Sequence, residues 1–294
     1  IVDTNKKILL KGMDLEDLKL WTKLHNFPDF RAQQIYEWMY THGIQDVADM
    51  SNISKGCKSI INKKCILNTL RIESQTKSDT TATVKYLFKT SDNYFIESVS
   101  MVDKDGRHTV CISSQSGCNL GCDFCATAKM GLMKNLSSGE IIDQLIIIRR
   151  VSKKRIDNVV YMGMGEPFLN YDNVIKSANI INSEKGFNIS ANKITISTVG
   201  IVPKIQKFIN EKIKYGLAIS LNAPNDSIRN QIMPINNKWT ISDLIDINKK
   251  YVREYKRNKI TFEYVIMDDI NSSVDDAIEL SKILNIARCK VNII

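Results

Sequence analysis

Three cysteines near the middle of the chain are spaced so that they could hold an iron–sulfur cluster. Cys118, Cys122 and Cys125 form the pattern C-x3-C-x2-C, on a segment that also contains Gly117 and Gly121. Three thiolates on one tight loop can bind three irons of a cubane cluster and leave the fourth iron without a protein ligand. The glycines would let the loop fold closely around such a cluster. The spacing therefore predicts a redox metal centre with an open coordination position for a substrate or cofactor.

A zinc site and inert buried cysteines are the alternatives for these residues. A structural zinc site takes four ligands, and none of His25, His42 and His108 lies within the loop as a fourth. Inert cysteines are common singly, but three at this spacing are not. The chain has seven cysteines in all, an odd number, and in so large a chain this usage favours metal or redox chemistry over a disulfide framework.

A second motif, Met162-Gly-Met-Gly-Glu166-Pro, comes directly after a predicted strand. Its glycines would let the backbone approach a ligand, and Glu166 offers a carboxylate for an ammonium group. The motif is not a dinucleotide fingerprint, because Phe168 stands where the third glycine would be. Alone it is most often only a turn. A ligand-binding role is favoured here because only one predicted helix separates the motif from the cysteine loop.

The hydrophobic periodicity, which predicts the helices and strands that position these motifs, changes along the chain. Residues 1–75 are predicted to form a small helical accessory domain, with helices from Asp14, over Phe30–Tyr40 and from Ser54. Residues 76–294 are predicted to form one larger domain. It begins with strands, of which Ala82–Phe88 and Tyr94–Met101 read as an antiparallel pair.

After the cysteine loop, helices and strands alternate. The capping box Ser137-Ser-Gly-Glu140 opens the first helix. The predicted strands are 156–162, 193–198, 215–221, 259–267 and 289–294, with helices at about 172–183, 202–212, 241–255 and 274–284. Such alternation implies parallel strands. With the strand at Val110–Ser113 there are six units, so we expect an α/β fold, either a partial (β/α)6 barrel or an open sheet, with ligands at the carboxyl ends of the strands.

The composition bounds the partners and the compartment. The 294 residues carry a formal net charge of +9, which favours a polyanionic partner such as nucleic acid without proving one. The basic runs Arg149–Arg155 and Lys249–Lys259 are candidate phosphate contacts. Taken alone, each basic run is explained at least as well by a solvent-exposed helix end with favourable charge placement as by RNA binding. No apolar run is long enough for a bilayer and no leader opens the chain, so a cytoplasmic protein without a membrane partner is expected.

Taken together, the motifs resemble the radical S-adenosylmethionine (radical SAM) superfamily and, within it, the RlmN/Cfr family of RNA methyltransferases. The matching segments run in order: Phe30-Arg-Ala-Gln-Gln-Ile35, Cys111-Ile-Ser-Ser-Gln-Ser-Gly-Cys118, Met162-Gly-Met-Gly-Glu-Pro-Phe-Leu-Asn170, Ile194-Thr-Ile-Ser-Thr198, Ser220-Leu-Asn-Ala-Pro-Asn-Asp226 and Met233-Pro-Ile-Asn236. Phe168-Leu-Asn-Tyr-Asp172 and Ala223-Pro-Asn-Asp226 are closer to the RlmN branch than to the resistance-conferring Cfr branch.

This resemblance implies methylation of carbon 2 of an adenine in 23S ribosomal RNA and, in some members, transfer RNA. The implied cofactors are a 4Fe–4S cluster and S-adenosylmethionine (SAM). In the family, one SAM methylates a cysteine near the C-terminus. The cluster cleaves a second SAM to a 5′-deoxyadenosyl radical, which abstracts hydrogen from that methyl group, and the carbon radical adds to the adenine. Another cysteine resolves the protein–RNA adduct by forming a disulfide. An electron donor such as flavodoxin and a monomeric enzyme are also expected.

The roles of individual residues follow by motif from the same resemblance. Cys118, Cys122 and Cys125 would bind the cluster, Cys111 would be the resolving cysteine and Glu97 the proton acceptor. The implied SAM contacts are Gly165, Glu166, Ser197, Ser220, Leu221, Asn222 and Asn292. Family members usually have histidine where this chain has Asn222, so that contact is expected to survive with altered strength.

The methyl-accepting cysteine of the family would lie beyond residue 294. Residue 1 is Ile, and Lys290–Ile294 reads as the middle of a buried strand, so a fragment is expected. Cys57, Cys65 and Cys289 are expected to be packing residues. The 294 residues alone are therefore expected to bind cluster and SAM without completing methyl transfer.

Three other functions fit parts of the pattern. A different radical SAM enzyme, such as an activase that makes a glycyl radical on a partner protein, would not need Cys111 or the segment Ser220–Asp226. A non-enzymatic iron–sulfur or zinc protein that binds RNA would have a fourth metal ligand and would not cleave SAM. A pure electron carrier would not need so long a chain. Formation of 5′-deoxyadenosine separates an enzyme from the last two.

Overall fold

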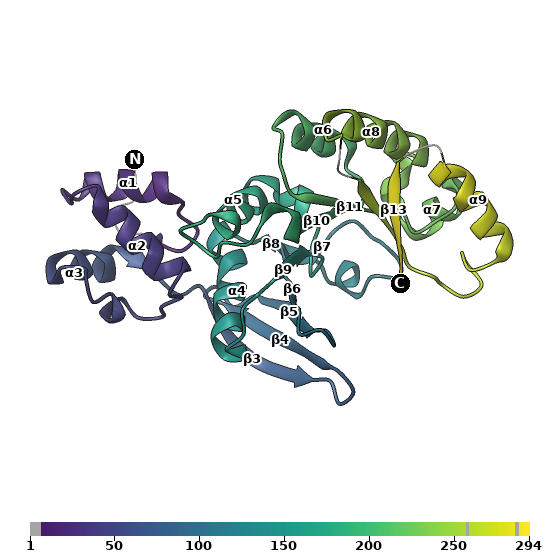
Figure 1. Ribbon diagram of the computed structural model, residues 1–294. Coiled ribbons are helices and arrows are strands. Elements are labelled where there is room, and N and C mark those ends of the chain that lie inside the picture. The colour runs from purple at the N-terminus through teal and green to yellow at the C-terminus, as the bar shows by residue number, and fades with distance from the viewer. Residues whose placement is uncertain (1–6, 257–258, 286–287) are drawn as a thin grey trace.

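The N-terminal part of the chain is a helical domain, on the left of Figure 1. The computed structural model describes residues 7–256, 259–285 and 288–294. The helical domain contains β1 (Ile8–Leu9), α1 (Leu15–Leu24), α2 (Phe30–Tyr40), the 3-10 turn η1 (Val47–Asp49), α3 (Lys55–Lys64) and β2 (Cys65–Ile66). Asp14 caps α1 through a capping box with Asp17, and Ser54 caps α3. The three helices expected from the sequence are confirmed.

A large sheet follows, with nine strands in the described part of the chain, in the order β13-β12-β11-β10-β9-β6-β5-β4-β3. Their bounds are β3 (Leu70–Lys77), β4 (Ala82–Thr90), β5 (Phe95–Val102), β6 (His108–Cys111), β9 (Asn158–Tyr161), β10 (Ile194–Thr198), β11 (Gly216–Ser220), β12 (Ile260–Tyr264) and β13 (Cys289–Ile293). Strands β3 to β6 pair antiparallel, and β6, β9, β10, β11, β12 and β13 pair parallel in sequence order. All of β3 belongs to this sheet, so it crosses the domain boundary expected at residue 75.

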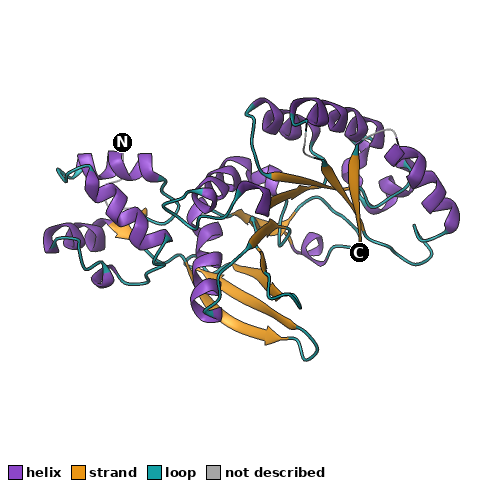
Figure 2. Cartoon of the chain, viewed as in Figure 1, coloured by secondary structure: helices purple, strands orange, loops and turns teal. Residues whose placement is uncertain are grey.

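Helices connect the parallel strands and cover one face of the sheet (Figure 2). They are α4 (Ser138–Ser152), α5 (Tyr171–Asn182), α6 (Val202–Asn210), α8 (Ile241–Glu254) and α9 (Val274–Asn285), with 3-10 turns η3 (Pro167–Asn170), η4 (Ala191–Lys193) and η5 (Pro234–Asn237). The short helix α7 (Asp226–Ile232) follows β11 and packs against the cysteine loop. The predicted α/β class and the run of six parallel strands are confirmed. None of the helices in the described ranges has the length and apolarity that a membrane span needs.

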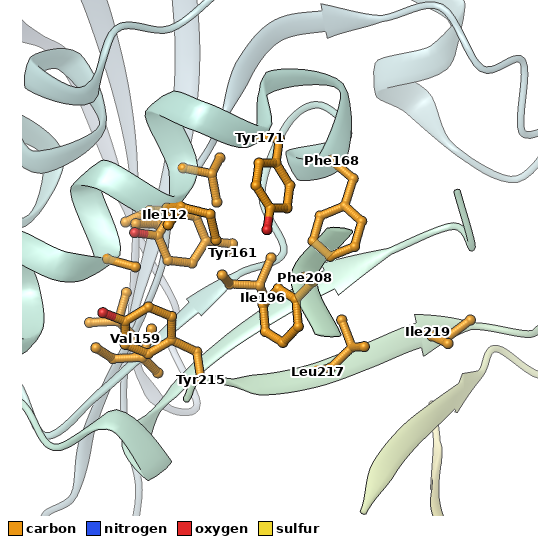
Figure 3. Packing of buried hydrophobic residues seen from close by; sticks show 14 of the residues in the cluster. Ile112, Val159, Tyr161, Phe168, Tyr171, Ile196, Phe208, Tyr215, Leu217 and Ile219 are labelled. Carbon is orange, nitrogen blue, oxygen red and sulfur yellow. The ribbon is translucent and has the colours of Figure 1, made fainter. Parts of the chain in front are cut away.

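The apolar core lies between the sheet and these helices. Side chains alternate along each strand, and one set, including Tyr161, Ile196 and Leu217, is almost fully buried. Figure 3 shows Ile196 and Leu217 beside Phe208 of α6, whereas Tyr161 points away from Phe208 and its hydroxyl bonds Ser177 of α5 at 2.7 Å. The other set lies on the opposite face of the sheet, which the described helices leave open and which is more polar. One face of the sheet therefore forms the apolar core with the helices, and the opposite, more polar face is available to ligands.

The helical domain shares its core with the larger domain. Ile142 and Ile146 of α4 and Ile180 of α5 belong to its cluster of buried side chains. An ion pair between Lys11 Nζ and Asp143 Oδ1, 2.7 Å long and with both side chains fully buried, joins the two domains. Burial lowers the pKa of Lys11 although Asp143 favours its charged form. This junction fixes where the helical domain stands relative to α4.

Candidate active site

The cysteine loop is carried by a hairpin outside the large sheet. Strands β7 (Gln115–Cys118) and β8 (Gly131–Asn135) pair antiparallel and enclose the loop, which ends in the 3-10 turn η2 (Ala126–Met130). Gly117 adopts φ +75°, and a Cβ there would lie 1.8 Å from the carbonyl oxygen of Gly131. Only glycine fits a left-handed backbone in such close contact with the partner strand. The hairpin thus brings the start and the end of the loop together.

The three thiols of the loop lie close together, and Cys118 and Cys122 have a raised pKa. Burial is the main cause of the raised pKa of Cys118 and of Cys122, the latter to about 12, and the neighbouring cysteines add to it. Backbone N–H groups of Asn119 and Leu120 donate to the thiol of Cys118. Because thiols with a raised pKa are protonated at neutral pH, metal binding must release their protons.

The donor set fits a 4Fe–4S cluster. Among the described residues, no three His, Cys, Asp or Glu side chains converge as ligands of a single metal ion. A cubane cluster does not require such convergence, since each thiolate binds a different iron. What it does require is three thiols on one loop near backbone donors, and the loop supplies both.

Packing against the segment that follows β11 holds the loop in place. The N–H of Asp123 donates to the carbonyl oxygen of Ile232 at 2.9 Å. Cys122 packs in a small cluster with Ala223, Met233 and Ile235. The loop that follows β6 is therefore fastened to the segment that follows β11, so the cysteines face the carboxyl ends of the parallel strands.

Glu166 lies beside this loop in a buried position at the end of β9. Its Oε1 accepts from the N–H of Phe168 and its Oε2 from the N–H of Val199, both at 2.9 Å. Burial nevertheless raises the pKa of Glu166 to about 7. Gly165 before it adopts φ +92°, with no room for a Cβ because Gln115 stands 2.3 Å away. The second motif thus packs directly against the strand that leads into the cysteine loop.

The open face of the sheet collects most of the other predicted site residues. Strand register aligns Cys111 with Val160 of β9 and Val160 with Thr195 of β10. Ser197 lies two residues beyond Thr195 and therefore on the same face. A second row across the sheet consists of Ser220, Glu263 and Asn292. These side chains form a polar surface on the same side as the cysteine loop.

Cys111 and Glu97 also share this face. Cys111 is paired with Val99 of β5, and Glu97 is two residues from Val99. Glu97 is 42% exposed and forms an ion pair of 3.0 Å with Lys85. The pKa of Cys111 is raised to about 11, mainly by burial and further by the carboxylate of Glu263. The two predicted catalytic residues therefore lie on neighbouring strands, at the edge of the polar surface.

Leu221 and Asn222 are placed differently from the serines. The side chain of Leu221 is fully buried in the core. Asn222 adopts φ +58°, a left-handed conformation that asparagine tolerates. Its Oδ1 accepts from the N–H of Val265 at 3.0 Å, and its Nδ2 contacts the sulfur of Met233. Both residues thus make structural contacts at the carboxyl end of β11, and Leu221 can offer a ligand only its backbone.

Comparison with known proteins decides the family. Residues 112–281 match the Radical SAM superfamily, and residues 8–67 match the Ribosomal RNA large subunit methyltransferase N-terminal domain. The chain is 41% identical over 293 residues to the probable dual-specificity RNA methyltransferase RlmN of Bacillus thuringiensis subsp. konkukian, covering 98% of this chain and 80% of that protein. The relative of the same name from Bacillus anthracis (strain A0248) has the same identity and coverage.

A solved structure agrees. The crystal structure of a radical SAM methyltransferase from Sphaerobacter thermophilus superposes with a TM-score of 0.93 at 37% identity, over 97% of this chain and 84% of that one. The chain belongs to the RlmN family of radical SAM RNA methyltransferases. The fold and the expected activity of a radical SAM enzyme that methylates RNA are confirmed, and the family's cofactors are a 4Fe–4S cluster and SAM.

In this RlmN-family chain, four buried polar side chains that frame the site were not predicted. Gln144 bonds both backbone groups of Ser113, and Asn170 donates to the carbonyl oxygens of Ser114 and Leu136. Gln115 accepts from the N–H of Glu166 at 2.7 Å. Gln115 lies inside the motif Cys111–Cys118 and Asn170 ends the motif Met162–Asn170, so both were marked by their motifs. Nothing in the sequence marked Gln144.

Arg229 is the fourth of these residues and the largest. It is fully buried, and its guanidinium donates to the carbonyl oxygens of Val199, Ser220 and Leu221. Burial lowers its pKa to about 10, and Cys122 lies near enough to oppose that shift. Arg229 therefore ties the carboxyl ends of β10 and β11 together beneath the cysteine loop, where it also supplies positive charge for thiolates.

Proposed function

We propose that this chain methylates carbon 2 of an adenine in 23S ribosomal RNA and, as a second substrate, in transfer RNA. The observation that carries the proposal is that the cysteine loop and Glu166 lie next to each other, on the side of the sheet where Cys111 and the rest of the polar surface lie. The description of the Bacillus relatives as probable dual-specificity RNA methyltransferases supports two kinds of RNA substrate. Carbon 2 carries no acidic proton, so methyl transfer to it requires radical chemistry, which the cluster and SAM together supply.

We assign roles to the site residues as part of this proposal. Cys118, Cys122 and Cys125 bind the cluster. The SAM contacts are the backbone of Gly165 and Leu221, together with Glu166, Ser197, Ser220 and Asn292, and Asn222 is a positioning residue. Asn222 acts by holding the end of β11 against β12, because both ends of its amide are engaged by the protein.

Cys111 and Glu97 complete the assignment. Cys111 is the resolving thiol, and Glu97 accepts the proton that leaves the adenine ring. Both lie on the same face of neighbouring strands, which allows both to reach one bound base. We also propose a monomer that works in the cytoplasm, where its RNA substrates are, with a flavodoxin-like protein as electron donor.

The test is the position of the methyl group in RNA. The protein expressed from its complete gene, reconstituted with iron and sulfide and given methyl-labelled SAM, should yield 2-methyladenosine in ribosomal and transfer RNA transcripts. Nucleoside mass spectrometry distinguishes this product from 8-methyladenosine and from N6-methyladenosine. Methylation at another atom, or of neither RNA by a SAM-cleaving enzyme, would overturn the proposal. A Cys111→Ala variant should accumulate RNA joined covalently to the protein.

A further inference from the structure

A group of exposed cations lies at the C-terminal end of α4, outside the site described above. Arg150, Lys153, Lys154 and Arg155 are all exposed. In the described ranges none of the four forms an ion pair with a carboxylate, although several other surface lysines do. Like charges so close together repel one another, and the fold does not neutralise them.

These cations line a hollow instead of a convex surface. A cavity of about 430 Å³ lies between the end of α2 and the end of α4, lined by His42, Arg149, Arg150, Lys153, Lys154 and Arg155 together with Gly43 and Ile146. A second cavity, of about 360 Å³, lies between α4 and the ends of β3 and β4, and Lys77 and Lys154 contribute to it. Among the residues that the structure describes, no acidic side chain lines either cavity, and Lys154 belongs to both.

Two features fix the conformation of the C-terminal end of α4. Arg149 donates to the carbonyl oxygen of Tyr40 at 2.8 Å, and its guanidinium stacks on Phe187 at 4.6 Å. It therefore fixes the helical domain against α4 and shapes the first cavity. Lys153 has φ +53°, in the left-handed region that favours glycine or asparagine at a helix end. A lysine is held there at a cost in backbone energy, so its side chain is a candidate for function.

The distance from the cysteine loop limits what can occupy the cavities. Helix α4 has 15 residues, which is about 22 Å at 1.5 Å per residue. Its first turn follows β8 of the cysteine hairpin, and the cations lie at its other end (Figure 1). A single nucleotide in the active site cannot reach them, whereas a folded RNA can. An electron donor must dock close to the cluster, which makes a donor protein the weaker candidate for this surface.

We propose that the two cavities at the C-terminal end of α4 bind the phosphodiester backbone of the RNA substrate at a distance from the target adenine. Arg150, Lys153 and Lys154 contact phosphates, and Arg149 is a positioning residue. These contacts read no base, so they serve any RNA whose shape presents both the adenine and a backbone segment to the enzyme. The proposal rests on RNA methylation as the function and adds to it where the RNA is held.

Binding of labelled RNA as a function of salt tests the proposal. The triple variant Arg150→Ala, Lys153→Ala, Lys154→Ala is compared with the triple variant Lys249→Ala, Lys250→Ala, Arg253→Ala on α8, which removes the same charge. The probes are a fluorescent transfer RNA transcript and a fluorescent 23S ribosomal RNA fragment, titrated by anisotropy between about 50 and 200 mM salt.

The α4 variant should bind at least about ten-fold more weakly, and its log–log salt slope should be shallower by about 2 to 3. The α8 variant should stay within about two-fold of wild type: although its residues belong to the second basic run of the sequence, they line neither cavity, so it loses only general attraction. Equal losses in both variants, or no loss in the α4 variant, would overturn the assignment. So would a slower reduction by flavodoxin with unchanged RNA binding, because the surface would then serve the donor.

Two further measurements separate this proposal from misfolding and from failure of the proposed function. Lys153→Gly relieves the left-handed backbone, so it should melt no lower than wild type while the salt slope falls by about 1. Unchanged RNA affinity in this variant would contradict a phosphate contact. SAM cleavage without RNA should be equal in all variants. A wild type that cleaves SAM and binds neither RNA would overturn both proposals, whereas tight binding by every variant overturns this one alone.

Discussion

Gly117 lies so close to Gly131 that a Cβ on Gly117 would stand 1.8 Å from the carbonyl oxygen of Gly131. This contact closes the hairpin on which the three cysteines are mounted. The contact between Gly117 and Gly131 brings β7 and β8 together, and this pairing holds the three cysteines of the loop close to one another. The cluster therefore depends on a residue that binds no iron.

Gly117→Ala should lose the cluster. The alanine would have to relieve both the clash and a left-handed backbone worth about 1–2 kcal/mol, and the hairpin would have to open. Gly106→Ala is the matched control, since Gly106 has φ +81° and a Cβ added there would meet no described atom within 4 Å. Iron and sulfide per chain after reconstitution should fall severalfold in the first variant and stay at the wild-type level in the second. Equal iron contents would contradict this role of Gly117.

The buried carboxyl of Glu166 should make stability depend on pH before iron and SAM are added. Burial raises its pKa from 4.5 to about 7, so the folded state favours the protonated form. The stabilisation is fully present below pH 4.5 and is lost as the pH rises through about 7. The loss is ~3 kcal/mol relative to Glu166→Gln, which does not titrate. Urea unfolding of both chains across this pH range measures it, and parallel pH profiles would be the contrary result.

Cys111 should be a slow nucleophile in the resting enzyme. Its pKa of about 11 leaves little thiolate at neutral pH, and Glu263 contributes to that shift after burial. Iodoacetamide labelling, followed at the Cys111 peptide by mass spectrometry, should be ~100-fold slower than for a thiol with an ordinary pKa near 9. Glu263→Gln should speed it severalfold. Asp275→Asn on α9 removes a remote charge and should leave the rate unchanged; equal rates in all three chains would exclude the influence of Glu263.

Replacing only Lys11 of the Lys11–Asp143 ion pair should lower the free energy of unfolding strongly. Both side chains are fully buried, and Asp143 also accepts from the backbone N–H groups of Thr69 and Leu70. Lys11→Met leaves a buried carboxylate without its cation and should destabilise the chain by ~3–5 kcal/mol. The exposed pair Lys19–Glu16 is the control, and Lys19→Met should cost ~0–1 kcal/mol. Chemical denaturation gives both values, and equal costs would refute the importance of this junction.

The sequence predicted the large elements because their signals are local. Alternation of apolar residues placed β10 and β11 within a residue or two, and the capping box at Ser137 marked the start of α4. It did not predict β3, which is mostly exposed and lacks an apolar pattern, or the short helix α7, which spans only seven residues. The hairpin β7–β8 was missed because its pairing depends on Gly117 and on a contact across the loop.

The sequence named candidate reactive residues for the site but did not identify the residues that hold them in place. The cysteines and Glu166 lie in motifs whose residue types indicate metal binding and ligand binding. Arg229 was not predicted, because an arginine in a polar helix is normally expected at the surface, whereas here it is fully buried among backbone carbonyl oxygens. The structural contacts of Leu221 and Asn222 depend likewise on the register of β11 with β12, which no short motif records.

Cleavage of SAM by the reconstituted chain tests the central claim most directly. After anaerobic reconstitution and reduction with dithionite, the chain should convert SAM to 5′-deoxyadenosine and methionine, as measured by liquid chromatography and mass spectrometry. Cys118→Ala, Cys122→Ala and Cys125→Ala should each abolish the product. Cys289→Ala, outside the loop, should leave it unchanged. The absence of 5′-deoxyadenosine from an iron-loaded wild-type chain, or its persistence when a loop cysteine is replaced, would contradict the assignment of this loop as the radical SAM centre.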